Sequence, residues 1–186
     1  MRTFIAIELD DAVRKQLRNL QEKLRPHCGK LRWVDPNHIH LTLKFLGEIP
    51  DARVPSVSEA MQQLAREFGP FDIGIRKTGT FPPHQSIKVV WVGIEDPAGG
   101  LAKYQARCED LLAALGFPKE RRRFSPHLTL ARNRDPAGSA AIRAALDHEP
   151  PFDAGIQTVT GATFYQSTLT PRGPIYNALS KHALGA

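Results

Sequence analysis

Two histidines and two threonines recur in this chain with the same spacing. The tetrapeptide His-Leu-Thr-Leu begins at His40 and again at His127, in segments that read as β-strands. Because strand side chains alternate between faces, His40 and Thr42 share one face, as do His127 and Thr129, while the leucines point into a core. Imidazole can serve as acid or base near neutral pH, and a threonine hydroxyl can donate to a phosphate oxygen. The pattern favours phosphorus chemistry, with one imidazole neutral and the other protonated.

A metal site is the main alternative for these histidines. His38 and His40 stand two residues apart, a spacing that allows two imidazoles to share one ion. The second copy has Ser125 at the position that matches His38, and neither motif has a convergent carboxylate. We therefore expect no metal and no cofactor. The remaining histidines are expected on the surface: His27, His84, His148 and His182.

The elements around the motifs also occur twice. Pro-Phe-Asp-x-Gly-Ile begins at residue 70 and again at 151, and each copy continues to Thr-Gly and a phenylalanine. We expect one domain, 1–186, built from two repeats at about 1–83 and 84–186.

Each repeat follows the order strand, helix, strand, helix, strand. Apolar residues at helical spacing predict helices that begin near Asp10, Pro55, Leu101 and Asp135. Besides the motif strands, we expect strands over 4–9, 71–81, 87–94 and 152–164, and an edge strand over 175–179. Periodicity leaves the strand directions open, although the glycine-containing stretches favour antiparallel pairing.

Composition and charge indicate the size of the domain, the kind of partner and the cellular location. The 186 residues are 41% hydrophobic, enough for one well-buried domain, and the net charge of +6 suits an anionic partner. Arg121, Arg122 and Arg123 lie just before the second motif, where they could contact such a partner. No apolar run reaches the 18 or so residues of a membrane span, so we expect a cytoplasmic protein without membrane contact. Cys28 and Cys108 lack the spacing of a zinc site or disulfide framework, and Cys108 falls on a helical apolar stripe.

At these residues the chain resembles the two-histidine (2H) phosphoesterases, most closely the RNA 2',3'-cyclic phosphodiesterases once called 2'-5' RNA ligases (LigT, ThpR). The resemblance spans nearly the whole chain. It is carried by residues 2–7, by His-Leu-Thr-Leu-Lys-Phe-Leu-Gly from His40, by Gly-Thr-Phe-Pro from Gly79, and by Phe-Ser-Pro-His-Leu-Thr-Leu-Ala-Arg from Phe124. It implies an α+β fold that is bilobal and duplicated, with two antiparallel sheets lining a central cleft and helices outside. It also implies a metal-independent reaction on RNA ends bearing a 2',3'-cyclic phosphate, such as tRNA fragments or nucleotides, by a protein expected to be a monomer.

Residue by residue, the resemblance makes His127 the general base that activates water and His40 the general acid that protonates the leaving O3', giving a 2'-phosphate. Thr42 and Thr129 hold phosphate oxygens. Arg132, just beyond the second motif and expected on the strand face of Thr129, is a further candidate phosphate ligand.

Phe45 is a candidate for stacking a base, whereas packing is favoured for Phe4. His38 departs from the family pattern and has no assigned role. The symmetry of the two motifs alone allows the acid and base to be reversed.

Two other functions fit the same residues. Ligation of RNA ends through a 2'-5' bond is the same chemistry run backwards, with a ribose hydroxyl in place of water. A non-catalytic module that holds an RNA phosphate is the other alternative, although binding alone does not need both histidines.

Overall fold

The computed structural model of the chain describes residues 1–83, 86–171 and 173–185. Nine strands and four α-helices lie in these residues, together with three short 3₁₀ turns. The strands are β1 (Arg2–Ile7), β2 (Arg32–Trp33), β3 (Leu41–Glu48), β4 (Phe71–Phe81), β5 (Val89–Glu95), β6 (His127–Arg132), β7 (Asp153–Val159), β8 (Gly161–Thr170) and β9 (Gly173–Ala183). The helices are α1 (Asp11–Leu24), α2 (Val54–Glu67), α3 (Gly100–Ala114) and α4 (Ser139–His148).

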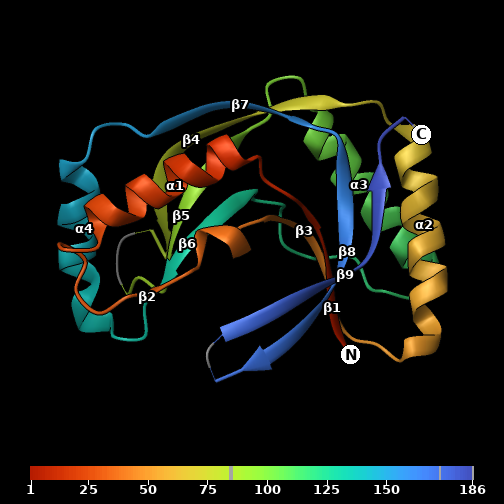
Figure 1. Cartoon of the computed structure of the whole chain (residues 1–186), viewed down its shortest axis with the longest axis horizontal. Helices are drawn as coiled ribbons and strands as arrows, with labels where there is room; N and C mark the ends of the chain where they lie inside the picture. Colours follow the sequence, from red (N-terminus) through yellow and green to blue (C-terminus); the bar gives the residue numbers. More distant parts are fainter. Residues whose placement is uncertain (84–85, 172, 186) are drawn as a thin grey trace.

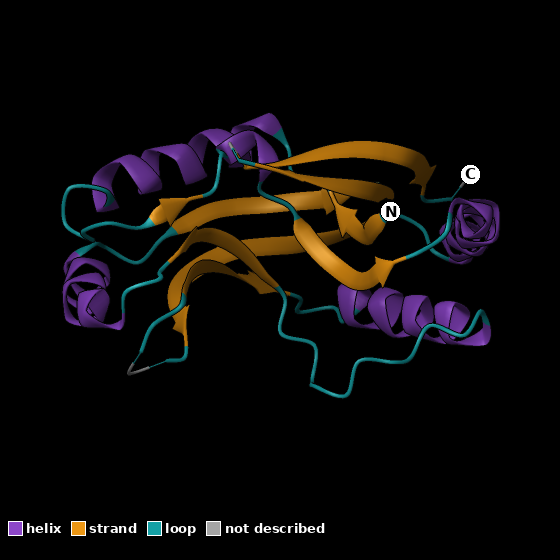
Figure 2. Ribbon diagram, turned by 90° about the horizontal axis from the view of Figure 1, so that it is seen from below, coloured by secondary structure: helices purple, strands orange, loops and turns teal. Residues whose placement is uncertain are grey.

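The strands form two sheets. One has the order β3-β1-β8-β9 and the other the order β2-β6-β5-β4-β7, and every pairing among the described residues is antiparallel. The helices lie on the outside of the sheets (Figure 1, Figure 2). The expected α+β fold with two antiparallel sheets and external helices is confirmed, and the strand directions that periodicity left open are all antiparallel.

Each sheet is covered by helices from both halves of the chain. Helix α1 follows β1 of the four-stranded sheet, yet the Gln21 side chain donates to the backbone oxygen of Leu130 in β6 of the other sheet, at 3.0 Å. Helix α3 follows β5 of the five-stranded sheet, yet its Glu109 contacts Lys44 of β3. The two halves therefore interlock, and neither has a complete core of its own.

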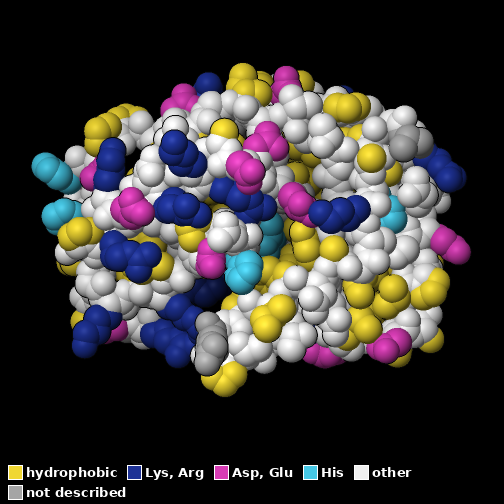
Figure 3. Space-filling model, viewed as in Figure 1, with side chains coloured by type: hydrophobic (Ala, Val, Ile, Leu, Met, Phe, Trp, Pro, Cys, Tyr) yellow, Lys and Arg dark blue, Asp and Glu magenta, His cyan; other side chains and the backbone are white. Residues whose placement is uncertain are grey.

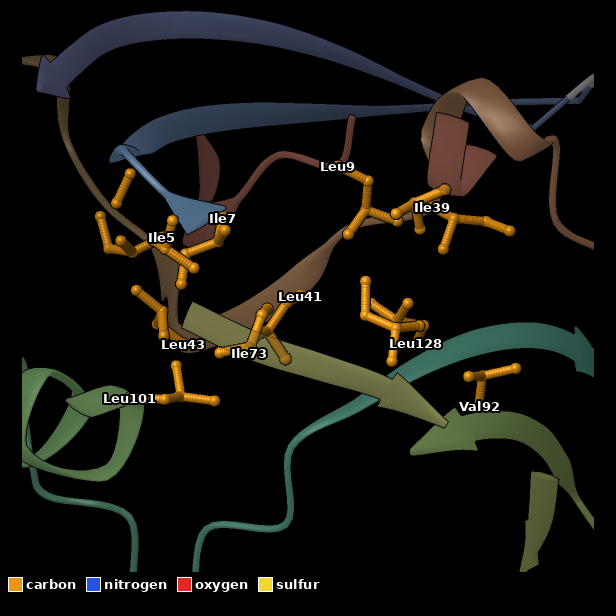
Figure 4. Packing of buried hydrophobic residues seen from close by; sticks show 14 of the residues in the cluster. Ile5, Ile7, Leu9, Ile39, Leu41, Leu43, Ile73, Val92, Leu101 and Leu128 are labelled. Atoms are coloured by element: carbon orange, nitrogen blue, oxygen red, sulfur yellow. The ribbon is translucent and has the colours of Figure 1, made fainter. Parts of the chain in front are cut away.

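Leucines of both motifs lie in one continuous core. Leu41, Leu43, Leu128 and Leu130 are all buried, and Figure 4 shows three of them packed among side chains such as Ile73. Burying a side chain of this size contributes about 1.5–3 kcal/mol. The leucines thus fix the faces of β3 and β6, and leave the histidine and threonine side chains on the opposite face.

The expectation of one strand over 152–164 is wrong. The chain leaves β7 at Val159, which pairs with β4 in the five-stranded sheet, and enters β8 at Gly161, which pairs with β1 and β9 in the four-stranded sheet. A Cβ at Gly161 would lie 2.6 Å from the backbone oxygen of His182, so the crossing needs glycine there. The C-terminal strand exists at the sheet edge, as expected, but it is longer than 175–179.

The other sequence expectations had mixed outcomes. His27 and His148 are exposed, whereas His182 is buried between Ser180, which lies 2.8 Å from its Nε2, and Gln62. His84 falls outside the described residues. Cys108 is buried, as expected. Among the described residues, no helix combines the length and apolar character needed to cross a bilayer.

Candidate active site

The two motif histidines make matching hydrogen bonds. His40 lies just before β3, and its Nδ1 is 2.8 Å from the backbone oxygen of His38. His127 begins β6, and its Nδ1 is 2.7 Å from the backbone oxygen of Ser125. A carbonyl oxygen only accepts, so Nδ1 carries the hydrogen in both rings. Each Nε2 is therefore the atom that takes up or gives away the second proton, as an acid or base requires.

A β-bulge stands at the last residue of each motif. Thr42 lies opposite Ala6 and Phe45 opposite Phe4, so the register gains one residue at Leu43. Because Phe4 and Ala6 share a face, the bulge brings Phe45 to the face of Thr42. Phe45 is 65% exposed there, which leaves its ring free for a ligand.

The second bulge does the same for Arg132. Thr129 lies opposite Trp91 and Arg132 opposite Val89, so an extra residue stands at Leu130. Strict alternation would place Arg132, three residues beyond Thr129, on the opposite face. The bulge restores the shared face and makes Arg132 the positional counterpart of Phe45.

Aromatic rings surround His40. Its imidazole stacks on Phe4 at a centroid distance of 4.8 Å, and the edge of Tyr176 meets it at 5.3 Å. Phe4 stacks in turn on Tyr165, at 5.2 Å. Phe4, for which packing was expected, is 3% exposed. Burial among these rings disfavours the charged imidazolium and lowers the pKa of His40 from 6.5 to about 4.

Arg14 of α1 holds the segment that carries His40. Its guanidinium donates to the backbone oxygens of Leu9, Pro36, Asn37 and Ile39 at 2.8–3.3 Å. The positive charge also contributes to the lowered pKa of His40, after burial. Nothing in the sequence marks this arginine, because its partners are all backbone atoms, three of them in the turn before His40.

The face around His127 is built differently. Phe81 of β4 meets the His127 ring edge-on at 5.0 Å and lies 5.2 Å from the Trp91 ring. Trp91 lies flat over Gly79, where a Cβ would stand 2.3 Å from indole carbons. The glycine in the Gly-Thr-Phe-Pro segment thus makes room for the Trp91 indole. Trp91 lies opposite Thr129 in the neighbouring strand.

Tyr176 connects the two faces. The ring of this β9 residue contacts Phe4, His38 and His40. Burial raises the pKa of its hydroxyl, and the charge of Arg132 on the other sheet opposes this rise. Figure 3 shows a hollow near the middle of the molecule with histidine side chains at it and lysine and arginine side chains gathered beside it. Tyr176 therefore links the ring cluster around His40 to the charge of Arg132 on the other sheet.

A polar cluster lies beyond the aromatic rings. The Tyr165 hydroxyl donates to Glu8 at 2.7 Å, and Thr163 and Lys181 contact the same carboxylate oxygen at 2.8 and 2.9 Å. Despite an opposing effect of burial, these contacts hold the pKa of Glu8 at about 2. A pocket of about 300 Å³ opens beside Glu8 and Lys181, away from the motif histidines. The cluster anchors Tyr165, and through it the ring stack under His40.

His38 faces Tyr176, with their rings 5.4 Å apart. No group of three or more metal-ligating side chains occurs in the part of the chain that the structure describes. Arg121, Arg122 and Arg123 are exposed.

Comparison with known proteins identifies the family. The model of the LigT like phosphoesterases matches the chain twice, over residues 7–91 and 92–176. The chain belongs to this family. The RNA 2',3'-cyclic phosphodiesterase of Thermus thermophilus is 36% identical over 192 residues, with 99% of this chain and 90% of that protein covered. The enzyme of the same name from Methanothermobacter thermautotrophicus is 30% identical, with 95% of each chain covered.

A solved structure places this LigT like phosphoesterase among close structural relatives. The crystal structure of TT0787 of Thermus thermophilus superposes with a TM-score of 0.84 at 33% identity, covering all of this chain and 98% of that one. The duplicated, bilobal fold is therefore that of the LigT like phosphoesterases.

Proposed function

We propose that this phosphoesterase hydrolyses the terminal 2',3'-cyclic phosphate of RNA to a 2'-phosphomonoester, with His127 as base and His40 as acid. The names of the curated relatives support the RNA 2',3'-cyclic phosphodiesterase activity. The observation that carries the mechanism is the pair of matching Nδ1 hydrogen bonds, because they leave the Nε2 of each histidine for proton transfer.

The reaction is one displacement at phosphorus. Nε2 of His127 takes a proton from water as the water oxygen bonds to phosphorus, and the bond from phosphorus to O3' breaks. Nε2 of His40 gives its proton to O3', which leaves as a hydroxyl. The 2'-ester bond remains. His127 then loses its proton to solvent and His40 regains one, which completes the cycle.

The other site residues bind the charge that develops. Thr42 and Thr129 donate hydroxyl hydrogen bonds to the non-bridging oxygens, and Arg132 supplies a fixed positive charge on the face of Thr129. Phe45 offers an exposed ring on the opposite sheet for the terminal base. Because acid, base and cation are all side chains, we propose that the reaction needs no metal.

Substrate binding must lead to protonation of the His40 imidazole. With a pKa of about 4, this imidazole is neutral at pH 7 in the free protein, whereas the acid must hold a proton. A phosphate anion beside the ring favours the imidazolium and so raises its pKa. Protonation of His40 therefore accompanies substrate binding.

The test is hydrolysis of an oligonucleotide ending in a 2',3'-cyclic phosphate, in excess EDTA. We expect a 2'-phosphate product, and loss of nearly all activity in His40→Ala and in His127→Ala. His27→Ala and His148→Ala remove exposed histidines and serve as matched controls. A 3'-phosphate product, or full activity in either motif variant, would show the mechanism to be wrong. Activity lost in EDTA and restored by one ion would favour a metal hydrolase, and joined ends would favour ligation.

We also propose that the chain is one domain of two repeats, about 1–83 and 84–186, acting as a monomer. The twofold family match and the bulges at Leu43 and Leu130 support the repeats. The proposed boundary adjoins residues 84–85, which lie outside the described part of the chain. Light scattering should give a mass near 20.6 kDa.

A further inference from the structure

Two arginines stand directly opposite each other at the edge of the five-stranded sheet. Arg32 of β2 pairs with Arg132 of β6, so both side chains project from the same face. Like charges in this arrangement repel each other. Both side chains are exposed, and no carboxylate pairs with either among the described residues. An anion between them would relieve the repulsion.

Arg32 lies farther from the histidines than Arg132 does. The residues opposite Arg132 and His127 are Val89 and Gly93, four apart, which corresponds to about 13 Å along the strand. β2 lies a further strand spacing outward, about 4.8 Å from β6. An anion held by Arg32, on this outer strand, is therefore a different group from the phosphate that Arg132 holds beside Thr129.

The β8–β9 hairpin encloses the same place from the other sheet. Arg32 Nη2 lies 4.0 Å from the position of a Cβ on Gly173, where β9 begins, so its guanidinium reaches the hairpin. Farther along β9, burial raises the pKa of the Tyr176 hydroxyl, and the positive charges of Arg132 and Arg2 oppose this rise. Lysine and arginine side chains gather on this side of the hollow in Figure 3, where β2, β6 and the hairpin lie in Figure 1. The arginines of β2 and β6 therefore lie together close to the start of β9.

We propose that Arg32 binds an internal phosphodiester of the RNA strand whose cyclic end, held beside Arg132, lies between His40 and His127. This subsite rests on the proposed function and extends it, because it makes a single-stranded oligonucleotide, rather than a cyclic mononucleotide, the preferred substrate. A guanidinium suits this role, since its planar fork donates two hydrogen bonds to phosphate oxygens and keeps its charge at any physiological pH.

The test compares two substrates, a 2',3'-cyclic mononucleotide and a single-stranded tetranucleotide with the same cyclic end. We expect Arg32→Gln to lower the ratio of kcat/KM for tetranucleotide over mononucleotide roughly tenfold, as loss of one charged hydrogen bond predicts. Arg25→Gln is the matched control. It removes the same charge from a nearby arginine. The Arg25 guanidinium lies 5.2 Å from the ring centroid of Trp33, the residue after Arg32 in β2.

A binding measurement keeps the subsite separate from the reaction. The fluorescence anisotropy of a labelled tetranucleotide with a 2'-phosphate end gives Kd at several salt concentrations. In Arg32→Gln, the slope of log Kd against log salt should fall by about 0.7, the value for one phosphate contact on a single strand. Should the wild-type protein hydrolyse neither substrate, the proposed function fails and this slope still decides the subsite. An unchanged slope, or an equal effect of Arg25→Gln, would overturn the proposal.

Discussion

Acidifying the free protein should leave the His40 imidazole uncharged until about pH 4. The ring is stacked on Phe4 and makes a T-shaped contact with Tyr176, and burial is the main cause of its lowered pKa. The change from 6.5 to about 4 corresponds to about 3 kcal/mol against the charged form. At pH 7 only about one molecule in a thousand then carries the proton.

A bound phosphate should raise the pKa of His40 and cancel most of the effect of burial. A unit negative charge about 4 Å from the imidazolium contributes about 4 kcal/mol at an effective dielectric constant near 20. Dividing by about 1.36 kcal/mol per pH unit gives about three units, which returns the pKa of His40 to about 7. An acid with that pKa works at neutral pH, so the burial of His40 prevents protonation before the substrate arrives without preventing catalysis.

Histidine NMR measures both values. The ring signals of His40, assigned by their absence from His40→Gln, should titrate near pH 4 in the free protein and near pH 7 with a 2'-phosphate product bound. The exposed His27 and His148 should not respond to the ligand. A free His40 that titrates at pH 6 to 7 would refute the burial argument, and one that stays below pH 5 with product bound would refute its role as the acid.

Three further outcomes follow from contacts outside the histidines. Arg14→Ala should lower kcat more than it raises KM, because it frees the turn that carries His40, and Arg14→Lys should recover part of kcat. Lys44→Met should lower the free energy of unfolding by about 3–5 kcal/mol in urea, since it leaves the Glu109 carboxylate buried without its partner. An equal loss in Lys44→Arg would contradict that reasoning. Tyr104→Phe should raise the free energy of unfolding by about 1 kcal/mol, because the buried Tyr104 hydroxyl has no hydrogen-bond partner in the described residues. An unchanged free energy of unfolding would mean that water binds this hydroxyl.

The sequence predicted what depends on local pattern. Alternation placed the leucines of the motifs in the core, and helical spacing identified the buried stripe from Val13 to Leu24. It failed where distant strands decide the outcome. One strand was expected across Thr160, yet β7 and β8 belong to different sheets.

The surroundings of the candidate site were less predictable than its histidines. Tyr176 and Tyr165 reach His40 only because β8 and β9 add to the sheet beside β1. The face of Arg132 depends on a bulge that strict alternation does not anticipate. Arg14 acts through backbone atoms, which leave no trace in residue types.

The position of β1 also governs when the protein can fold during synthesis. This first strand lies inside its sheet, between β3 and β8, and Arg2 pairs with Ser167. At ordinary translation rates the ribosome needs roughly 10 to 30 s to add the intervening residues. Throughout that time one edge of β1 has no native partner, and Tyr165, one of the two rings stacked on Phe4, has not been made. A nascent chain stalled before β8 should therefore be sensitive to protease and lack activity, although both histidines are already present.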